Sequence, residues 1–307
     1  MITRLKCLSY LFTLSIILGI PIDMLSNAYA QGPEEFLDWS IETSKKTFYP
    51  GEPVLLIFNI KNNGKQEQEI YYGGGGIEAF SMEIFDSNNT VVAKGGRIQR
   101  PGVSRFVTTR VPAGLTGTRS IVLNRWCSTL LPPGTYHVIC NVDYGLVSEL
   151  TAKKNAPHPQ HNVRLELDFQ ITKSNTSEFK KIIEALVNRA FTTDDRSAQG
   201  LMDRQIAENS LAFTESSLGV PHQLRLLRTN QYTWLRRDVI NSLVRSKTLD
   251  AGKGLVEAVE DPSMKDVKRE LIDAVYRLRE TGKSDIIKAT DGFVLKYKRP
   301  VLTKPID

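Results

Sequence analysis

The spacing of the apolar residues changes once along this chain, near residue 175. Before that point apolar and polar residues alternate, most strictly in Val163–Ile171, where every second side chain is apolar. After it the apolar residues recur every three to four positions. Alternation is typical of a half-buried strand, and the longer period is typical of an amphipathic helix. The sequence therefore predicts a multi-domain β + α protein: a β-rich part (residues 31–174), a helical part (residues 175–290) and a basic tail (residues 291–307).

The first thirty residues have the composition of a secretory signal peptide. Arg4 and Lys6 precede the apolar run Leu8–Ile22, and the small-x-small pattern Ala28–Ala30 follows. A membrane anchor is the alternative, but the run is shorter than the roughly 20 residues that a spanning helix needs. We therefore expect cleavage after Ala30, export to the periplasm or the cell exterior, and no stable membrane insertion afterwards.

The charge of the chain is mild. The full sequence carries a net charge of +6, and residues 31–307 keep 38 basic and 33 acidic side chains, spread along the chain. Nucleic-acid-binding domains usually concentrate basic residues in one patch or stripe. Together with the predicted export, this argues against a nucleic-acid partner.

Short strands separated by turn signals fill the β-rich part. Pro53–Gly64 places Val54, Leu56, Phe58 and Ile60 on one face and ends in an Asn-Asn-Gly turn. Residues 80–96 form two further strands joined by Asp86-Ser-Asn-Asn, a hairpin-type loop. About nine such strands indicate an antiparallel β-sandwich.

Tyr136 follows a Leu-Pro-Pro-Gly turn at the start of a strand. This arrangement resembles the tyrosine corner, in which the hydroxyl donates to an upstream backbone group. Together with FYPGEPVLLIFNIKNNG and the hairpin, it resembles bacterial immunoglobulin-like domains, including the intracellular proteinase inhibitor type. The resemblance covers Leu37–Lys173. Its motifs are structural, so it implies a fold and says little about function.

Two cysteines, Cys127 and Cys140, remain after the predicted cleavage. Export favours a disulfide between them. Cys140 shares the inward face of its strand with Tyr136, which follows the turn near Cys127. The rise per residue of a strand puts Cys140 roughly 13 Å along the strand from that turn. A disulfide needs Cα atoms within about 7 Å of each other. The pattern leaves open a bridge or two buried free thiols.

The helical part contains an internal repeat. Gln223–Arg245 and Leu255–Arg277 align without gaps at a spacing of 32 residues, each as a short helix, a polar turn and a longer helix. The pattern resembles HEAT-type α-solenoid repeats, with Asp261-Pro262 in the turn and basic pairs at the start of the second helix; the usual repeat is longer, around 40 residues. Helices at Phe179–Ala190 and Ala198–Phe213 are expected to form earlier units.

No catalytic or cofactor motif is present. The glycine run Gly73–Gly76 lacks the helix that a phosphate-binding loop opens, so we predict a loop. His158 and His161 supply two imidazoles where a metal site needs three or four ligands. Gly-x-Ser-x-Gly, His-Glu-x-x-His and Cys-x-x-Cys motifs are missing from the sequence. We expect neither enzymatic activity nor a cofactor.

Basic and aromatic residues near the ends of the repeat helices form the candidate site. We interpret them as a groove for a protein partner, possibly acidic, because solenoids expose extended binding surfaces. The alternative is a solvated face with ion pairs four residues apart, and Trp234 is either a second aromatic anchor or a core residue. The predicted partner-binding residues are Arg225, Arg228, Tyr232, Arg236, Arg237, Lys268 and Arg269.

Three functional hypotheses follow. The first is an exported, non-enzymatic protein-binding or envelope-assembly module. The second is a protease inhibitor acting through an exposed loop, at residues 71–79 or 95–105. The third is a carbohydrate-binding protein or hydrolase with a site at the junction of the two parts.

Overall fold

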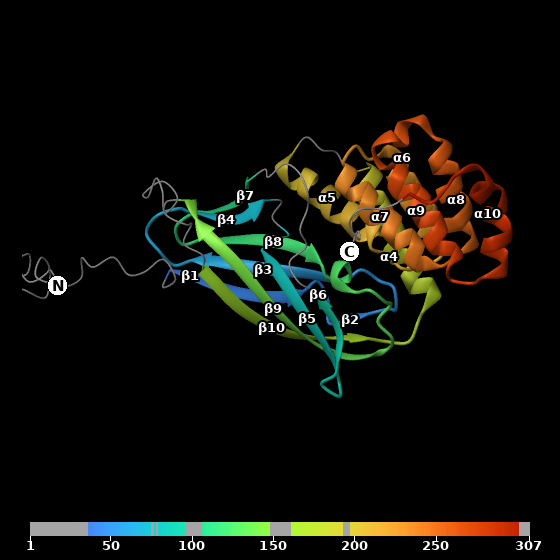
Figure 1. Ribbon diagram of the computed structural model, residues 1–307. Coiled ribbons are helices and arrows are strands. Elements are labelled where there is room, and N and C mark those ends of the chain that lie inside the picture. The colour runs from blue at the N-terminus through green and yellow to red at the C-terminus, as the bar shows by residue number, and fades with distance from the viewer. Residues whose placement is uncertain are drawn as a thin grey trace, which may run out of the picture.

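The computed structural model describes residues 36–74, 77, 79–95, 106–147, 161–192 and 197–300. Figure 1 shows a β-rich N-terminal region followed by a helical C-terminal region that packs against one end of it. No helix among the described residues combines the length and the apolar character that crossing a bilayer requires. The order of the two regions is the one that the change of period predicts.

Among the described residues of the N-terminal region, ten strands form two sheets. One sheet has the order β1-β3-β8. The other has the order β2-β10-β9-β4-β7, and β5 pairs with both β9 and β6. The strands are β1 (Leu37–Thr43), β2 (Thr47–Phe48), β3 (Leu55–Asn62), β4 (Gln68–Gly74), β5 (Phe80–Asp86), β6 (Val91–Gly95), β7 (Phe106–Val111), β8 (Thr116–Val122), β9 (Gly134–Leu146) and β10 (His161–Ile171).

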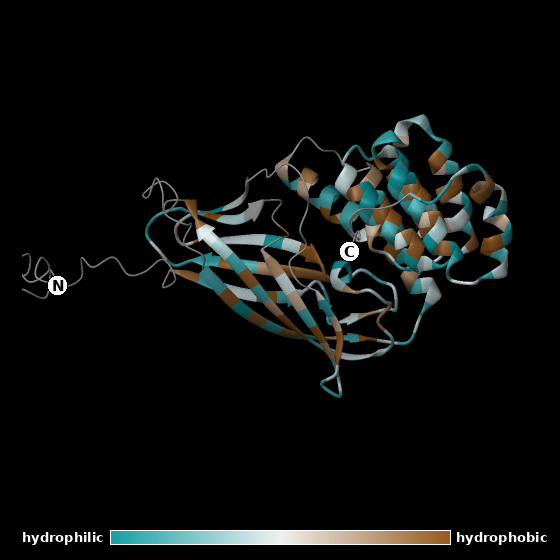
Figure 2. Ribbon diagram, in the orientation of Figure 1, coloured by the Kyte–Doolittle hydropathy of each residue, from teal (hydrophilic) through white to brown (hydrophobic). Residues whose placement is uncertain are grey.

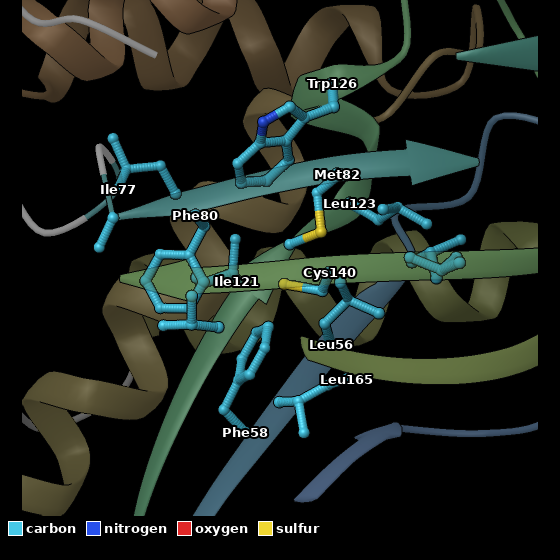
Figure 3. Packing of buried hydrophobic residues seen from close by; sticks show 14 of the residues in the cluster. Leu56, Phe58, Ile77, Phe80, Met82, Ile121, Leu123, Trp126, Cys140 and Leu165 are labelled. Carbon is cyan, nitrogen blue, oxygen red and sulfur yellow. The ribbon is translucent and has the colours of Figure 1, made fainter. Parts of the chain in front are cut away.

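One hydrophobic core lies between the two sheets. Phe58 of β3 and Phe80 of β5 come from opposite sheets, and their ring centroids are 4.9 Å apart. Figure 3 shows both rings beside Cys140, Met82 and Leu165. The alternation in β3 and β10 is confirmed, because the apolar positions are buried or half-buried and the polar positions between them are more exposed. In Figure 2 brown and teal accordingly alternate along the strands.

The predicted tyrosine contact is present. Tyr136 Oη donates to Pro132 O at 2.6 Å and fixes the turn that leads into β9. The hairpin loop is also confirmed, since Asp86 Oδ1 accepts from Asn88 N and Thr90 N, each at 2.9 Å. The glycine run differs from the prediction. β4 continues to Gly74 through an irregularity in its pairing with β7, so only its later glycines lie outside the described residues.

The two cysteines are free and buried. Cys140 lies on β9, paired with Met82 on one side and Leu165 on the other, in the middle of the core. Cys127 follows the 3-10 helix η2 (Leu123–Trp126), and its sulfur contacts Leu123 O at 3.9 Å. The disulfide left open by the sequence is not formed, because the turn before β9 does not bring the two side chains together.

Seven helices make up the described C-terminal region. Helices α6, α8 and α10 lie side by side in one layer, and α5, α7 and α9 lie side by side in another. The successive pairs α6–α7 and α8–α9 are the two units of the sequence repeat. The helices are α4 (Thr176–Thr192), α5 (Ala198–Ala212), α6 (Val220–Thr229), α7 (Thr233–Ser246), α8 (Leu249–Glu260), α9 (Lys268–Arg279) and α10 (Ser284–Lys296), with the 3-10 helix η3 (Pro262–Val267) before α9.

The C-terminal boundary predicted from the sequence is wrong. Helix α10 runs to Lys296, whereas the predicted tail begins at residue 291. Ile286, Thr290 and Phe293 are buried at helical spacing, and this stripe holds α10 against α8 and α9. The chain then turns back: Tyr276 Oη donates to Tyr297 O at 2.6 Å. The basic segment up to residue 300 therefore folds onto the helices.

Candidate functional site

The described residues contain no group of three or more His, Cys, Asp or Glu side chains arranged to hold a metal ion. The nearest approach to a catalytic arrangement is His137 on the outer face of β9. Its Nδ1 lies 2.8 Å from Asp168 Oδ1, and its Nε2 lies 3.4 Å from Glu166 Oε2. These three side chains stand on an open sheet face, without the pocket that would shield a reaction from water. Of the paired loop histidines, His161 begins β10 and His158 lies outside the described residues.

The junction between the two regions is occupied by charged and aromatic side chains. Arg125 of η2 reaches Asp238 of α7, with Nη2 and Oδ2 2.9 Å apart. The Arg125 guanidinium also lies 4.7 Å from the centroid of the Phe213 ring. Burial lowers the pKa of Arg125, and the Asp238 carboxylate opposes this shift. This contact joins the sheet region to the helices.

A second ion pair lies beside the first. Arg245 Nε is 2.6 Å from Glu215 Oε1, and Glu215 N donates to Gly51 O at 2.9 Å. Burial raises the pKa of Glu215, while Arg245 lowers it. Val122 of β8 is buried in the helical core itself. Among the described residues, the junction is thus a packed interface.

One open hollow lies on the outer face of the β1-β3-β8 sheet. It has a volume of about 220 Å³ and is lined by Asp38, Trp39, Ser40, Asn59, Lys61 and Thr116. A second, between α7 and α9, holds about 10 Å³, room for roughly one water molecule. Small-molecule sites are usually largely enclosed pockets. The first hollow is too open to be such a site, and the second is too small.

Three of the predicted partner-binding arginines are paired with acidic side chains from a neighbouring part of the helical stack. The partners are 29 to 33 residues apart in sequence, close to the repeat spacing of 32. Pairing four residues apart within one helix, the alternative interpretation, does not describe these contacts. The pairs are Arg228–Glu257 at 2.9 Å, Arg236–Asp266 at 2.7 Å and Arg237–Glu270 at 2.8 Å.

Two of the other predicted cations lie over aromatic rings. Arg225 lies over the Phe191 ring at 4.0 Å, and Lys268 lies over the Tyr297 ring at 5.4 Å. Arg269 is exposed, and it has no ion-pair partner in the part of the chain that the structure describes. The seven predicted residues therefore do not form one uniform basic groove.

Tyr232 is the most exposed of the predicted aromatic residues. Its side chain is 60% exposed and stacks on the half-buried Trp234 ring, with centroids 5.9 Å apart. Thr233 between them donates from Oγ1 to Asp266 Oδ2 at 2.8 Å. This bond places the two rings beside η3, where Lys265 is also exposed. We call Tyr232, Trp234, Lys265 and Arg269 the aromatic–basic edge.

Sequence reasoning missed the junction residues and Lys265. Nothing in the sequence relates Arg125 to Asp238, since they belong to different regions and to no common motif. Lys265 could have been found, because the 32-residue repeat aligns it with Thr233, which lies between the two aromatic residues. The loops suggested for protease inhibition are only partly described, and residues 96–105 lie outside the described residues.

No protein-family model matches the chain. The curated proteins likewise contain no match. Solved structures give distant similarities over about half of this chain. Red sea bream transglutaminase matches at 12% identity and a TM-score of 0.27, over 48% of this chain and 20% of that chain. The sporulation control protein Spo0M from Bacillus subtilis matches at 13% identity and a TM-score of 0.23, over 52% of this chain and 58% of that chain. A β-glucosidase from Erythrobacter marinus matches at 11% identity and a TM-score of 0.22, over 42% of this chain and 15% of that chain. This chain spans only a fifth of the transglutaminase. At these TM-scores the similarities carry no argument about function.

Proposed function

We propose that this chain is an exported, non-enzymatic protein-binding module, in which an immunoglobulin-like β-sandwich is joined to HEAT-like helical repeats. The fold assignment is supported by two sheets around one core, by the Tyr136–Pro132 contact and by two layers of paired helices. Export is supported by the composition of residues 1–30 and predicts that the mature protein begins at Gln31, which N-terminal sequencing would test.

The exposed Tyr232 ring, stacked on the half-buried Trp234, carries the binding proposal. A large aromatic ring left 60% exposed keeps apolar surface in water that a partner would cover. Tyr and Trp are enriched among the residues that contribute most to binding at protein interfaces. The junction ion pairs and Val122 hold the repeats to the sheets, so the edge is presented on a firmly supported scaffold.

Affinity capture with the full chain tests this function. We expect the wild-type protein to retain a defined partner from an envelope or secreted fraction, and Tyr232→Ser to lose it. Leu115→Ser is the matched control, because Leu115 is an exposed apolar residue of the sheet region with an exposed fraction of 58%, close to that of Tyr232. Capture of no protein by the wild type, or equal capture by Tyr232→Ser, would contradict the proposal.

A further inference from the structure

The aromatic–basic edge is held together by contacts across two successive helix pairs. Besides the Thr233–Asp266 bond, Arg236 Nη1 donates to Ser263 O at 3.1 Å and to Asp266 Oδ1 at 2.7 Å. These bonds fix the start of α7 against η3. Tyr232 and Trp234 therefore lie next to the turn that carries Lys265, and Arg269 follows one helical turn later on α9.

Two acidic residues of this edge, Asp266 and Glu270, are in ion pairs, and the Asp261 carboxylate at the start of η3 accepts from Ser263 N at 2.8 Å. Asp266 is occupied by Arg236 and Thr233, and Glu270 lies 2.8 Å from Arg237. Lys265 and Arg269 are exposed and, over the residues that the structure describes, have no acidic partner. Lys265 and Arg269 therefore contribute positive charge to the edge that carries the exposed Tyr232 ring.

The position of these cations adds to the positive potential. Lys268 and Arg269 are the first two residues of α9. Cations near a helix N-terminus are disfavoured, because the helix dipole is positive there. An anionic group docked at the edge would be attracted both by the side-chain charges and by the N-terminal end of α9.

We infer that the aromatic–basic edge binds an acidic segment of a partner protein, whose carboxylates meet Lys265 and Arg269 and whose apolar side chain covers Tyr232. This inference rests on the proposed protein-binding function and adds the chemistry of the partner to it. The positive charges of Lys265 and Arg269 favour carboxylates in the bound segment. The exposed Tyr232 ring favours an apolar side chain next to those carboxylates.

Synthetic peptides test the inference with the full chain. The probes are a labelled peptide that alternates Glu with Phe and a matched peptide that alternates Lys with Phe. We expect only the Glu/Phe peptide to bind, with an affinity that falls as salt rises, since screening weakens attraction between exposed charges. Lys265→Glu with Arg269→Glu should weaken binding by about tenfold or more, because each reversal replaces an attraction at the rim with a repulsion.

A matched variant controls for net charge. Lys253→Glu with Lys288→Glu makes the same change at exposed positions of α8 and α10, in the other helix layer, and should leave the affinity unchanged. Tyr232→Ser should weaken binding without altering the salt dependence. Equal weakening by the control pair would overturn the inference, as would absence of Glu/Phe binding or a preference for heparin or for phosphatidylglycerol vesicles over the peptide.

The two proposals fail in different ways. A natural partner that is lost with Tyr232→Ser but retained by the Lys265→Glu, Arg269→Glu variant would leave the binding function standing and refute the acidic segment. Binding of the Glu/Phe peptide without capture of any natural partner would support the chemistry of the edge and refute the protein-binding role.

Discussion

Gly51 lies where the sheet region contacts the helical region, and we expect a methyl group added at this position to loosen that contact. Its φ is +80°, and a Cβ added there would lie 2.4 Å from Glu215 O, the backbone of the helical region. Gly51 O also accepts from Glu215 N at 2.9 Å. Because the clash is with backbone, no rotation of a side chain relieves it. Gly51→Ala must therefore either shift the loop that contains residue 51 or increase the distance between this loop and Glu215.

The expected cost can be divided into two contributions. Placing a non-glycine residue in the left-handed region costs roughly 1–2 kcal/mol. Loss of the Gly51–Glu215 hydrogen bond adds roughly 0.5–1.5 kcal/mol, and displacement of the neighbouring packing adds to both. Gly114 isolates the first contribution, since its φ is +73° and a Cβ there would meet nothing within 4 Å. We therefore expect Gly51→Ala to lose about 2–4 kcal/mol of unfolding free energy and Gly114→Ala about 1–2 kcal/mol.

Urea unfolding followed by two probes measures the difference. Because the third tryptophan, Trp234, lies on α7, a Trp234→Phe background is used throughout, so that fluorescence reports Trp39 and Trp126 of the sheet region. Far-ultraviolet circular dichroism is dominated by the helices. In this background alone we expect the two transitions to coincide, and with Gly51→Ala we expect them to separate as the junction loosens. Equal losses of stability in Gly51→Ala and Gly114→Ala, with coincident transitions in both, would refute the close approach at Glu215.

Three further predictions concern other buried contacts. Arg125→Met should cost roughly 1.5–3 kcal/mol by urea unfolding, because it removes a charged hydrogen bond to the half-buried Asp238 carboxylate. Combining it with Asp238→Leu should recover most of that loss, and equal losses would contradict this. Tyr136→Phe removes the bond to Pro132 O and should cost roughly 0.5–1.5 kcal/mol by thermal unfolding, and an unchanged melting temperature would argue against the bond. Burial raises the pKa of Cys127 from 9.0 to about 12. As pH rises, the thiol therefore ionises in the unfolded state before it does so in the folded state. Its contribution to the free energy of unfolding falls between pH 9 and pH 12. Replacing Cys127 with Ala should reduce that slope by roughly 1.4 kcal/mol per pH unit, and an unchanged slope would contradict its burial.

Much of the local structure could be predicted from the sequence. The inward residues of β3 and β10 and the buried stripes of α7 and α9 follow from periodicity, since each strand or helix must bury its own apolar face. The contact of Tyr136 follows from its position after a turn. The extent of α10 was missed because a helix at the end of the stack has a narrower apolar stripe and lies beside a basic segment with a proline.

The candidate site could be predicted less well. The sequence indicated Tyr232 and the arginines near the ends of the repeat helices, and the repeat aligns Arg236 and Arg237 with Lys268 and Arg269. It could not show that Arg236 and Arg237 are neutralised, since their partners lie about thirty residues away in sequence. It gave no sign of the free charge that remains at Lys265 beside the aromatic pair.

Periodicity in the sequence is enough to predict which face of each strand and helix is buried, because the side-chain periods of 2.0 and 3.6 residues are local properties of the backbone. The tertiary structure alone decided which charges are neutralised and where the two regions meet. Ion pairs such as Arg125–Asp238 depend on distances between elements far apart in the chain, and these distances are set only when the two regions pack. The edge proposed to bind a partner is what remains exposed and positively charged after that packing.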